Sequence, residues 1–284
     1  MTKEQLTERL QQGPLILDGA TGSNLMLAGM PRGVSTELWV LEHRQALIDL
    51  QRAYVAAGSQ VVYAPTFQAN RVSMPDADIP SLIPSLVAVS REAVGGQVVV
   101  AGDVSTTGRM APLGPVTYDE LVECYMEAIT ALKRAGVDYI AAETLMTVEE
   151  ATAILDAANA VTDLPVVMSM TIEADGGLLF GGNIFDACEQ LEAMGAAAVG
   201  INCAVGPDQL TSIIRTLRER VTVPIIAKPN AGMPEINDQG VAVYSMGPEV
   251  FGQHMVALRD AGASLLGGCC GTSPDYIRAM CQSL

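Results

Sequence analysis

The chain has 284 residues, 49% of them hydrophobic, and a net charge of −16 at pH 7, with an isoelectric point near 4.4. It can bury a large core, and its acidity argues against nucleic acid or an anionic membrane surface as a partner. The charged N-terminus has no apolar signal core, and no run approaches the ~20 apolar residues that a membrane span needs. We therefore expect a cytoplasmic protein.

Short apolar runs rich in valine and isoleucine alternate with helical stretches, which is typical of βα units around a parallel sheet. The runs are residues 15–20, 60–67, 98–105, 138–145, 165–172, 197–203, 223–231 and 264–270. The clearest helices are 117–135 and 248–261, and residues 1–14 hold a further N-terminal helix.

Several of these helices end in a glycine that can turn the chain back toward the next strand. The pairs are Ala57-Gly58, Ala135-Gly136, Met194-Gly195 and Ala261-Gly262. Eight such units predict an α/β fold consisting of a single (βα)8 TIM barrel, with residues 1–284 as one domain. The longest irregular stretches, 29–42, 71–79 and 231–247, all follow predicted strands. We expect them on the C-terminal face, where barrel active sites form.

Cysteines close two of the predicted strands. Cys203 ends the sixth, and Cys269-Cys270 end the eighth within the sequence Gly267-Gly268-Cys269-Cys270-Gly271-Thr272. Strand ends two apart on one rim allow the three thiols to converge on a Zn²⁺ ion with an open fourth position. The alternative is three small, buried, apolar side chains.

Two carboxylates also close predicted strands: Asp18 the first and Glu143 the fourth. Together they could bind an ammonium group, while the backbone amides of Gly19, Ala20 and Thr21 could receive a carboxylate. Alternatively, each carboxylate caps the segment that follows it. The segment from Gly19 to Gly22 lacks the pattern of a phosphate-binding loop.

Other polar residues near strand ends carry weaker signals. Asp103 could line the site or anchor a loop, and for Lys228 we favour loop anchoring. The two histidines fall in predicted helices, which favours structural roles, and the remaining cysteines receive no role. These residues are His43, His254, Cys124, Cys188 and Cys281.

Taken together, the motifs resemble the homocysteine S-methyltransferase family, and most of all the homocysteine-binding barrel of cobalamin-dependent methionine synthase. They are Asp18-Gly19-Ala20-Thr21-Gly22, Gly200-Ile201-Asn202-Cys203, Ala227-Lys228-Pro229-Asn230-Ala231-Gly232 and the double-cysteine motif. The likeness runs from about Leu15 to the C-terminus. One departure is Ala64-Pro65, where the family more often has Thr-Asn.

The resemblance implies a set of site residues. Cys203, Cys269 and Cys270 would hold a single zinc ion, and the substrate thiol would take the fourth position. Asp18 and Glu143 would hold the amino group of homocysteine, with Gly19, Ala20 and Thr21 at its carboxylate. Thr66, Asp103 and Asn202 would complete the substrate-binding set.

The resemblance also implies the reaction, which makes methionine by methylating a zinc-bound homocysteine thiolate without a separate general base. Because the sequence ends shortly after Cys270, we expect a donor in trans: a methylcorrinoid (methylcobalamin) protein docking on the C-terminal face of the barrel. The alternatives are a small donor of the S-methylmethionine or betaine type, another thiol acceptor in a demethylation pathway, and a non-catalytic thiol or zinc sensor.

Overall fold

The structure is a computed structural model that describes residues 1–109, 114–237 and 242–284. Within these residues, eight parallel strands form one sheet in the order β1-β10-β7-β6-β5-β4-β3-β2. The strands are β1 (Leu15–Ile16), β2 (Val61–Tyr63), β3 (Val99–Ser105), β4 (Tyr139–Leu145), β5 (Val166–Met170), β6 (Ala198–Asn202), β7 (Ile225–Lys228) and β10 (Ala263–Leu266).

The two outer strands of this sheet approach each other and nearly close it into a barrel. The backbone N–H of Gln60 donates to the carbonyl of Ile16 at 2.7 Å, and the Ser59 hydroxyl donates to the carbonyl of Leu17 at 3.2 Å. The α/β barrel expected from the sequence is therefore confirmed.

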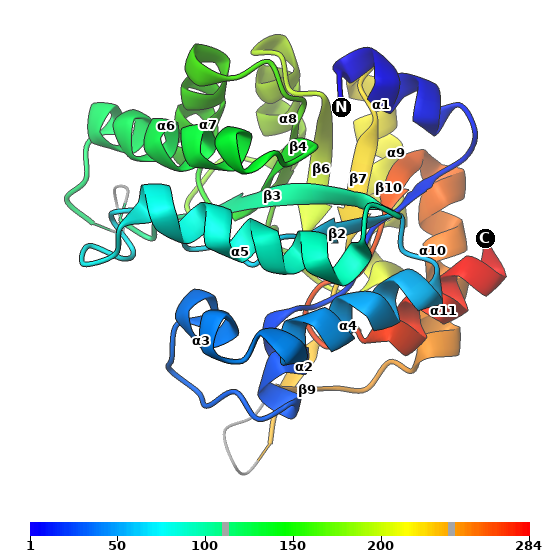
Figure 1. Cartoon of the computed structure of the whole chain (residues 1–284). Coiled ribbons are helices and arrows are strands. Elements are labelled where there is room, and N and C mark those ends of the chain that lie inside the picture. Colours follow the sequence, from blue (N-terminus) through cyan, green and yellow to red (C-terminus); the bar gives the residue numbers. More distant parts are fainter. Residues whose placement is uncertain (110–113, 238–241) are drawn as a thin grey trace.

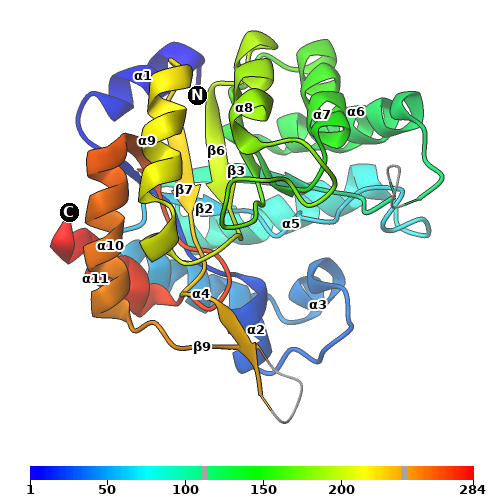
Figure 2. The ribbon, with the colours of Figure 1, turned by 180° about the vertical axis from the view of Figure 1, so that it is seen from behind.

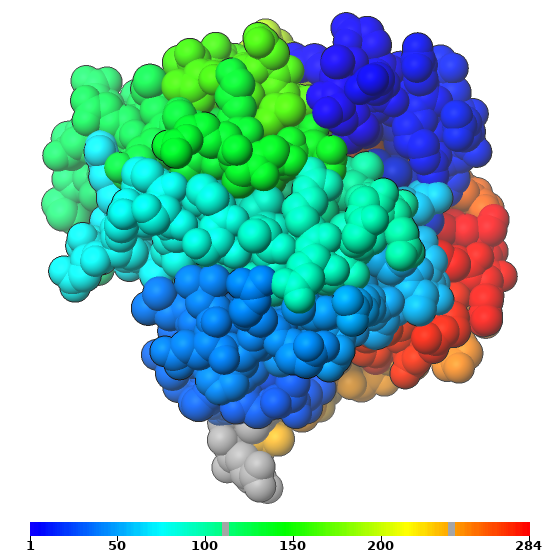
Figure 3. All heavy atoms as spheres, in the orientation of Figure 1, coloured from blue at the N-terminus to red at the C-terminus, as the bar shows by residue number. Residues whose placement is uncertain are grey.

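Helices surround the strands. They are α1 (Lys3–Leu10), α2 (Gly22–Leu27), α3 (Thr36–Glu42), α4 (Arg44–Ala57), α5 (Ile79–Val94), α6 (Tyr118–Ala135), α7 (Val148–Val161), α8 (Ile184–Ala193), α9 (Thr211–Arg220), α10 (Pro248–Ala261) and α11 (Pro274–Ser283), with a short 3-10 turn η1 (Pro207–Gln209). Figure 1 shows α4 and α5 in front of the sheet, and Figure 2 shows α8, α9 and α10 on the opposite side. Seen as spheres in Figure 3, the atoms of α4 and α5 lie across the middle of the front face.

Alternating side chains point inward from the strands and fill the barrel interior. They are Leu15, Leu17, Val61, Tyr63, Ala101, Tyr139, Ala141, Val167, Ala198, Ile226 and Leu265. Leu6 of α1 belongs to the same cluster and is only 1% exposed. Its burial contributes about 2 kcal/mol, and α1 thereby closes one end of the barrel.

Six of the eight strands end earlier than the sequence predicted because the residues that follow them turn into the loops of the rim, whereas β3 and β4 end as predicted at Ser105 and Leu145. Pro229 has no N–H to continue β7, and Gly267-Gly268 follow β10. The predicted cap glycines are confirmed, since Gly58, Gly136, Gly195 and Gly262 all have positive φ.

Two stretches predicted to be irregular contain regular elements. Residues 29–42 include α3, which begins where the Ser35 hydroxyl accepts a hydrogen bond from the Leu38 N–H. Residues 231–247 include the antiparallel pair β8 (Pro234–Ile236) and β9 (Ala242–Tyr244), and residues 238–241 of that stretch lie outside the described part. In Figures 1 and 2, β9 and α2 lie at the lower end of the molecule and α1 at the upper end.

Candidate active site

Strand periodicity explains why polar side chains meet at one end of the barrel. Side chains two residues apart on a strand point the same way, so the positions that follow the apolar interior layer also face inward. They are Asp103 on β3, Glu143 on β4, Ser169 on β5, Asn202 on β6 and Lys228 on β7. All five side chains are buried, and they form the floor of the candidate site.

Three sulfur atoms lie together beside this floor. The Sγ atoms of Cys203, Cys269 and Cys270 all lie within 4.8 Å of one another, and those of Cys203 and Cys270 are 3.4 Å apart. Tetrahedral zinc with Zn–S bonds near 2.3 Å requires sulfur atoms about 3.8 Å apart. The three thiols therefore fit the donor set of a zinc centre with one open position.

Backbone geometry directs the sulfurs toward one point. Cys203 follows β6 with φ +49°, a left-handed conformation that few side chains adopt. Its N–H donates to the carbonyl of Lys228 at 3.1 Å, and the Cys269 N–H donates to the carbonyl of Pro229 at 2.8 Å. The two cysteine segments are thus fastened to the end of β7, which lies between β6 and β10 in the sheet.

The three thiols share their protons. Hydrogen bonds from Cys203 and Cys269 lower the pKa of Cys270 to about 3. Hydrogen bonding to Cys203 and Cys270, together with burial, raises the pKa of Cys269 well above its ordinary value. Since metal-bound cysteines are thiolates, metal binding here would release the protons that the cluster still holds.

Lys228 lies among the carboxylates, so the sequence-based assignment of this residue to loop anchoring was wrong. Its Nζ lies 3.0 Å from Glu143 Oε2, 3.6 Å from Asp18 Oδ1, and 3.5 Å from the centre of the Tyr63 ring. Burial disfavours the ammonium form, but the charges of Glu143 and Asp18 outweigh that effect and raise the pKa of Lys228. It remains an ammonium group inside the barrel.

Two carboxylates keep an oxygen without a hydrogen-bond partner among the described residues. Asp18 accepts the Tyr63 N–H through Oδ2 at 2.8 Å, whereas its Oδ1 and the Oδ1 of Asp103 are buried and accept no hydrogen bond. Burial raises the pKa of Asp18 to about 6, against the pull of Lys228. Burial also raises the pKa of Asp103, with the charge of Glu143 adding to the effect. Buried oxygens of this kind are suited to accept a donor from a ligand.

The backbone after Asp18 is only partly engaged. The Ala20 N–H donates to the hydroxyl of Thr272 at 3.1 Å. Among the described residues, the N–H groups of Gly19 and Thr21 make no such bond, so two of the three amides predicted to receive a carboxylate remain available. A side chain at Gly19 would come within 2.7 Å of Thr272 and Tyr54, so this close approach requires glycine.

The two remaining residues of the predicted substrate set hold neighbouring strands. The Thr66 hydroxyl donates to the carbonyl of Asp103 at 2.8 Å and accepts its N–H at 3.1 Å. The Asn202 side chain is fully buried, and its amide binds Thr144 and Ser169. Their predicted contacts with substrate stay predictions.

One anchor of the rim was not found from the sequence. Glu150 in the first turn of α7 is fully buried. It accepts the N–H and hydroxyl of Thr107, each at 2.7 Å, and the hydroxyl of Tyr125 at 2.8 Å; the Thr106 hydroxyl also donates to it. These bonds hold the start of the segment after β3. The sequence signal was Thr106-Thr107 directly after the predicted strand, but its partner lies 43 positions away.

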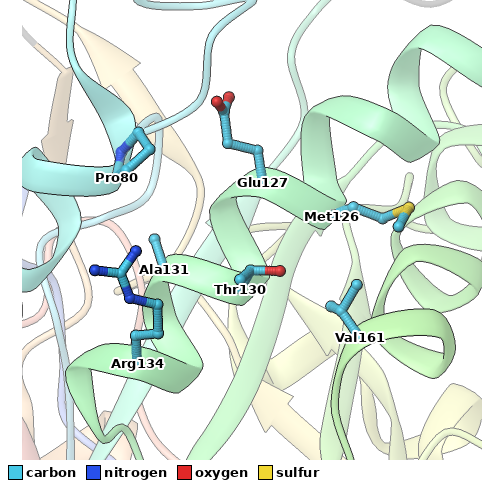
Figure 4. A pocket seen from close by; sticks show the side chains of 7 residues that line it. All are labelled: Pro80, Met126, Glu127, Thr130, Ala131, Arg134 and Val161. Carbon is cyan, nitrogen blue, oxygen red and sulfur yellow. The ribbon is translucent and has the colours of Figure 1, made fainter.

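The other candidate residues lie away from this site. His43 separates α3 from α4 rather than lying within a helix, and it stacks on Trp39. His254 lies in α10, Cys124 in α6, Cys188 in α8 and Cys281 in α11. A cavity of about 240 Å³ opens between α5, α6 and α7 and is lined by Pro80, Met126, Glu127, Thr130, Ala131, Arg134 and Val161. Figure 4 shows these side chains on the helices outside the sheet.

A TIM barrel with converging thiols and carboxylates at its C-terminal rim defines a class of barrel enzyme whose substrates bind at the strand ends. The chain belongs to the homocysteine S-methyltransferase family, whose model matches residues 15–284. The resemblance noted in the sequence is thereby confirmed.

Particular relatives agree with this assignment. Methionine synthase from Mycobacterium leprae is 29% identical over 301 residues, which cover 98% of this chain and 25% of that protein. The chain thus spans about a quarter of the length of this relative. The crystal structure of the homocysteine methyltransferase MmuM from Escherichia coli in its oxidised form superposes with a TM-score of 0.81 at 23% identity, covering 95% of this chain and 96% of that one. The metallated form gives 0.78 at 22% identity, with the same coverage. These superpositions show the fold.

Proposed function

We propose that the protein is a zinc-dependent S-methyltransferase that converts L-homocysteine to methionine. The observation that carries the proposal is the convergence of Cys203, Cys269 and Cys270, whose sulfurs lie within 4.8 Å of one another at the rim of a family barrel. These residues would hold one zinc ion and leave a position for the substrate sulfur. When bound, zinc supplies a thiolate nucleophile at neutral pH, where a free thiol with a pKa near 8.5 is mostly protonated.

The polar floor supports an amino acid as the thiol substrate. Asp18 and Glu143, the two carboxylates that pair with Lys228, carry two negative charges against its single ammonium, so one further cation would balance these three groups. The Oδ1 of Asp18, which accepts no hydrogen bond among the described residues, can accept one from the substrate ammonium. The amides of Gly19 and Thr21 would receive the substrate carboxylate, with Thr66, Asp103 and Asn202 around them.

The methyl transfer mainly requires that the substrate sulfur and the methyl carbon of the donor are correctly placed. The homocysteine sulfur attacks the methyl carbon in line, the new S–CH₃ bond forms, and the electron pair of the breaking bond leaves with the donor. Such a transfer requires the reacting atoms about 3–3.5 Å apart. Because the attacking sulfur is already a thiolate, we assign no residue as a general base.

We further propose that the donor is a methylcorrinoid protein that docks at the C-terminal face of the barrel. Support comes from the similarity to methionine synthase over 98% of this chain and from exposed apolar side chains on α2 and beside the β8–β9 hairpin. Leu27 is 86% exposed, Ile236 71% and Met233 53%. Exposed apolar side chains at the rim suit a macromolecular donor better than a small charged one.

A donor panel tests the proposal. Purified protein would be loaded with zinc and offered homocysteine together with methylcobalamin, S-methylmethionine, glycine betaine, S-adenosylmethionine or methyltetrahydrofolate, and methionine would be measured. We expect methylation from methylcobalamin and none from the other four donors. Activity with S-methylmethionine or betaine alone would replace the corrinoid donor with a small one, and full activity after removal of metal by a chelator would overturn the zinc mechanism.

A second panel addresses the acceptor. Homocysteine would be compared with 4-mercaptobutanoate, which has the same chain and carboxylate but no amino group. We expect a strong preference for homocysteine that is lost in Asp18→Asn. Equal use of both thiols would point to another acceptor, and binding of zinc and homocysteine without transfer from any donor would point to a sensor.

A further inference from the structure

Two residues of the site other than glycine have left-handed backbones, and both are next to proposed site residues. Thr144, with φ +60°, directly follows Glu143, and Cys203, with φ +49°, directly follows Asn202. Such conformations are unfavourable for residues with a side chain and persist only where surrounding contacts hold them. The contacts that hold Thr144 come from Asn202.

The Asn202 amide replaces a missing part of the strand ladder. The pairing of β4 with β5 is interrupted between Ala142 and Leu145. Across this gap, the Thr144 N–H donates to Asn202 Oδ1 at 2.6 Å, and Asn202 Nδ2 donates to the Thr144 hydroxyl at 2.7 Å. The Ser169 hydroxyl of β5 donates to the same Oδ1 at 2.9 Å. One side chain of β6 thus spans β5 to reach β4.

The same amide also reaches the sulfur cluster. Asn202 Nδ2 lies 4.0 Å from Cys269 Sγ, at the limit of an N–H···S hydrogen bond. Asn202 is fully buried, and its contacts with Thr144 and Cys269 are partly buried. A single side chain therefore touches the segment that carries Glu143 and a thiol of the proposed metal centre.

We propose that Asn202 is a positioning residue that fixes Glu143 relative to the three thiols, so that amino-acid recognition and metal binding depend on one another. This inference rests on the proposed function for its substrate side, and on the sulfur geometry alone for its metal side. Asn202 acts through Thr144 and Cys269 and needs no contact with the substrate.

The first test uses Asn202→Ala, with Asn159→Ala as a matched control. Asn159 lies on the exposed face of α7 and bonds only to the carbonyl of Met194 among the described residues. We expect Asn202→Ala to weaken zinc binding about tenfold or more in a chelator competition, and the control to leave it unchanged. Unchanged zinc affinity in Asn202→Ala would overturn the proposal.

The second test compares Thr144→Ala with Thr144→Gly, which remain informative if Asn202→Ala fails to fold. Both variants remove the hydroxyl, but only alanine retains the cost of the left-handed backbone. Calorimetry on the zinc-loaded protein should show homocysteine binding weakened about tenfold in Thr144→Ala and much less in Thr144→Gly. Equal affinities in the two variants would contradict the role given to the held backbone.

Binding of 4-mercaptobutanoate separates positioning from general damage. Thr144→Ala should change its affinity far less than that of homocysteine, because this thiol makes no use of Glu143. An equal loss for both thiols would indicate a merely structural role and overturn the inference. If the wild-type protein bound no homocysteine, the proposed function would fail, whereas the zinc measurement on Asn202→Ala would still decide the metal side.

Discussion

The Nζ atom of Lys228 lies 3.0 Å from Oε2 of Glu143, and both side chains are buried at the end of the barrel. An ion pair in this position costs desolvation, so its main effect is to fix the positions of these side chains in a confined space. Lys228, Glu143 and Asp18 together hold one ammonium and two carboxylates, so the ammonium group of an amino acid bound there would balance their charges.

Replacement of Lys228 by methionine tests this arrangement. The variant leaves Glu143 and Asp18 buried without their cation, so we expect the free energy of unfolding to fall by about 3–5 kcal/mol. Urea unfolding of the zinc-loaded protein measures the change. Lys133→Met on α6, where the ammonium is exposed and bonds to the carbonyl of Val161, is the control and should change stability little. Equal losses of stability in the two variants would show that the ion pairs of Lys228 with Glu143 and Asp18 do not contribute to the stability of the fold.

Replacement of Cys203 by alanine tests the metal centre. Two thiols cannot form the three-sulfur site, so we expect the purified variant to retain almost no zinc and to lose methyl transfer. The wild-type protein should bind one zinc per chain. Metal analysis by mass spectrometry measures this. Cys188→Ala removes a buried thiol of α8 that lies outside the cluster and should keep its zinc. Normal zinc content in Cys203→Ala would remove this residue from the ligand set.

The pKa of Asp18 predicts how homocysteine binding depends on pH. Burial raises this pKa to about 6 from 3.8, with Lys228 opposing the shift and Glu143 adding to it. The substrate ammonium needs the ionised carboxylate, so affinity should rise as pH increases through about 6. The ratio of the affinities for homocysteine and 4-mercaptobutanoate isolates this effect from ionisation of the thiol. In Asp18→Asn the ratio should not vary between about pH 5 and 7. A wild-type ratio that also stayed constant over this range would contradict the assignment.

The same shift has a consequence for stability. Because the folded protein binds the Asp18 proton more tightly than the unfolded chain does, the contribution of this group to the free energy of unfolding is largest below about pH 4 and decreases as the pH rises to about 6. Asp18→Asn removes this dependence. Urea unfolding of both proteins across that range measures the difference, which should be largest at the upper end. Parallel stability curves would show that Asp18 has no such shift.

The buried carboxylate of Glu150 offers a test of the rim. Glu150→Ala leaves the N–H of Thr107 and the hydroxyl of Tyr125 without their acceptor, and we expect a loss of about 3 kcal/mol in the free energy of unfolding. The neighbouring Glu149, which is exposed, provides a matched control in Glu149→Ala. If the two variants unfolded at the same urea concentration, Glu150 would not anchor the segment after β3.

Local patterns predicted the parts of the protein that depend on local sequence. Runs of valine and isoleucine located the strands, and glycines located the ends of the helices that precede them. Both signals are local because backbone preferences act over a few residues. The double cysteine and its neighbouring glycines indicated the candidate metal site, because this signal also lies within a few consecutive residues. Six of the eight strands were predicted to extend beyond their observed ends. At β7, for example, Pro229 has no N–H with which to continue the strand.

Residues whose importance depends on distant partners were harder to find. From the sequence alone, Lys228 was assigned to a loop. Its role depends on two carboxylates, Glu143 on β4 and Asp18 after β1, and Glu143 lies 85 positions away in the sequence. In the sequence, Asn202 is only the neighbour of Cys203. The role of its amide becomes clear from its hydrogen bonds to Thr144, whose irregular backbone lies on the far side of β5. Pairings of this range are properties of the closed sheet.

Cys203 and Cys270 lie 67 positions apart in sequence. The chain between them contains η1, α9, β7, the β8–β9 hairpin, α10 and β10. A metal ion held by these sulfurs would act as a cross-link that closes this segment into a ring, and it would restrict the unfolded chain as a long-range covalent bridge does. Loading with metal should therefore protect the backbone amides of β7 and β10 from hydrogen exchange more than those of β3 and β4. The zinc ion proposed to activate the substrate thiol would thus also influence the order in which the last third of the protein unfolds.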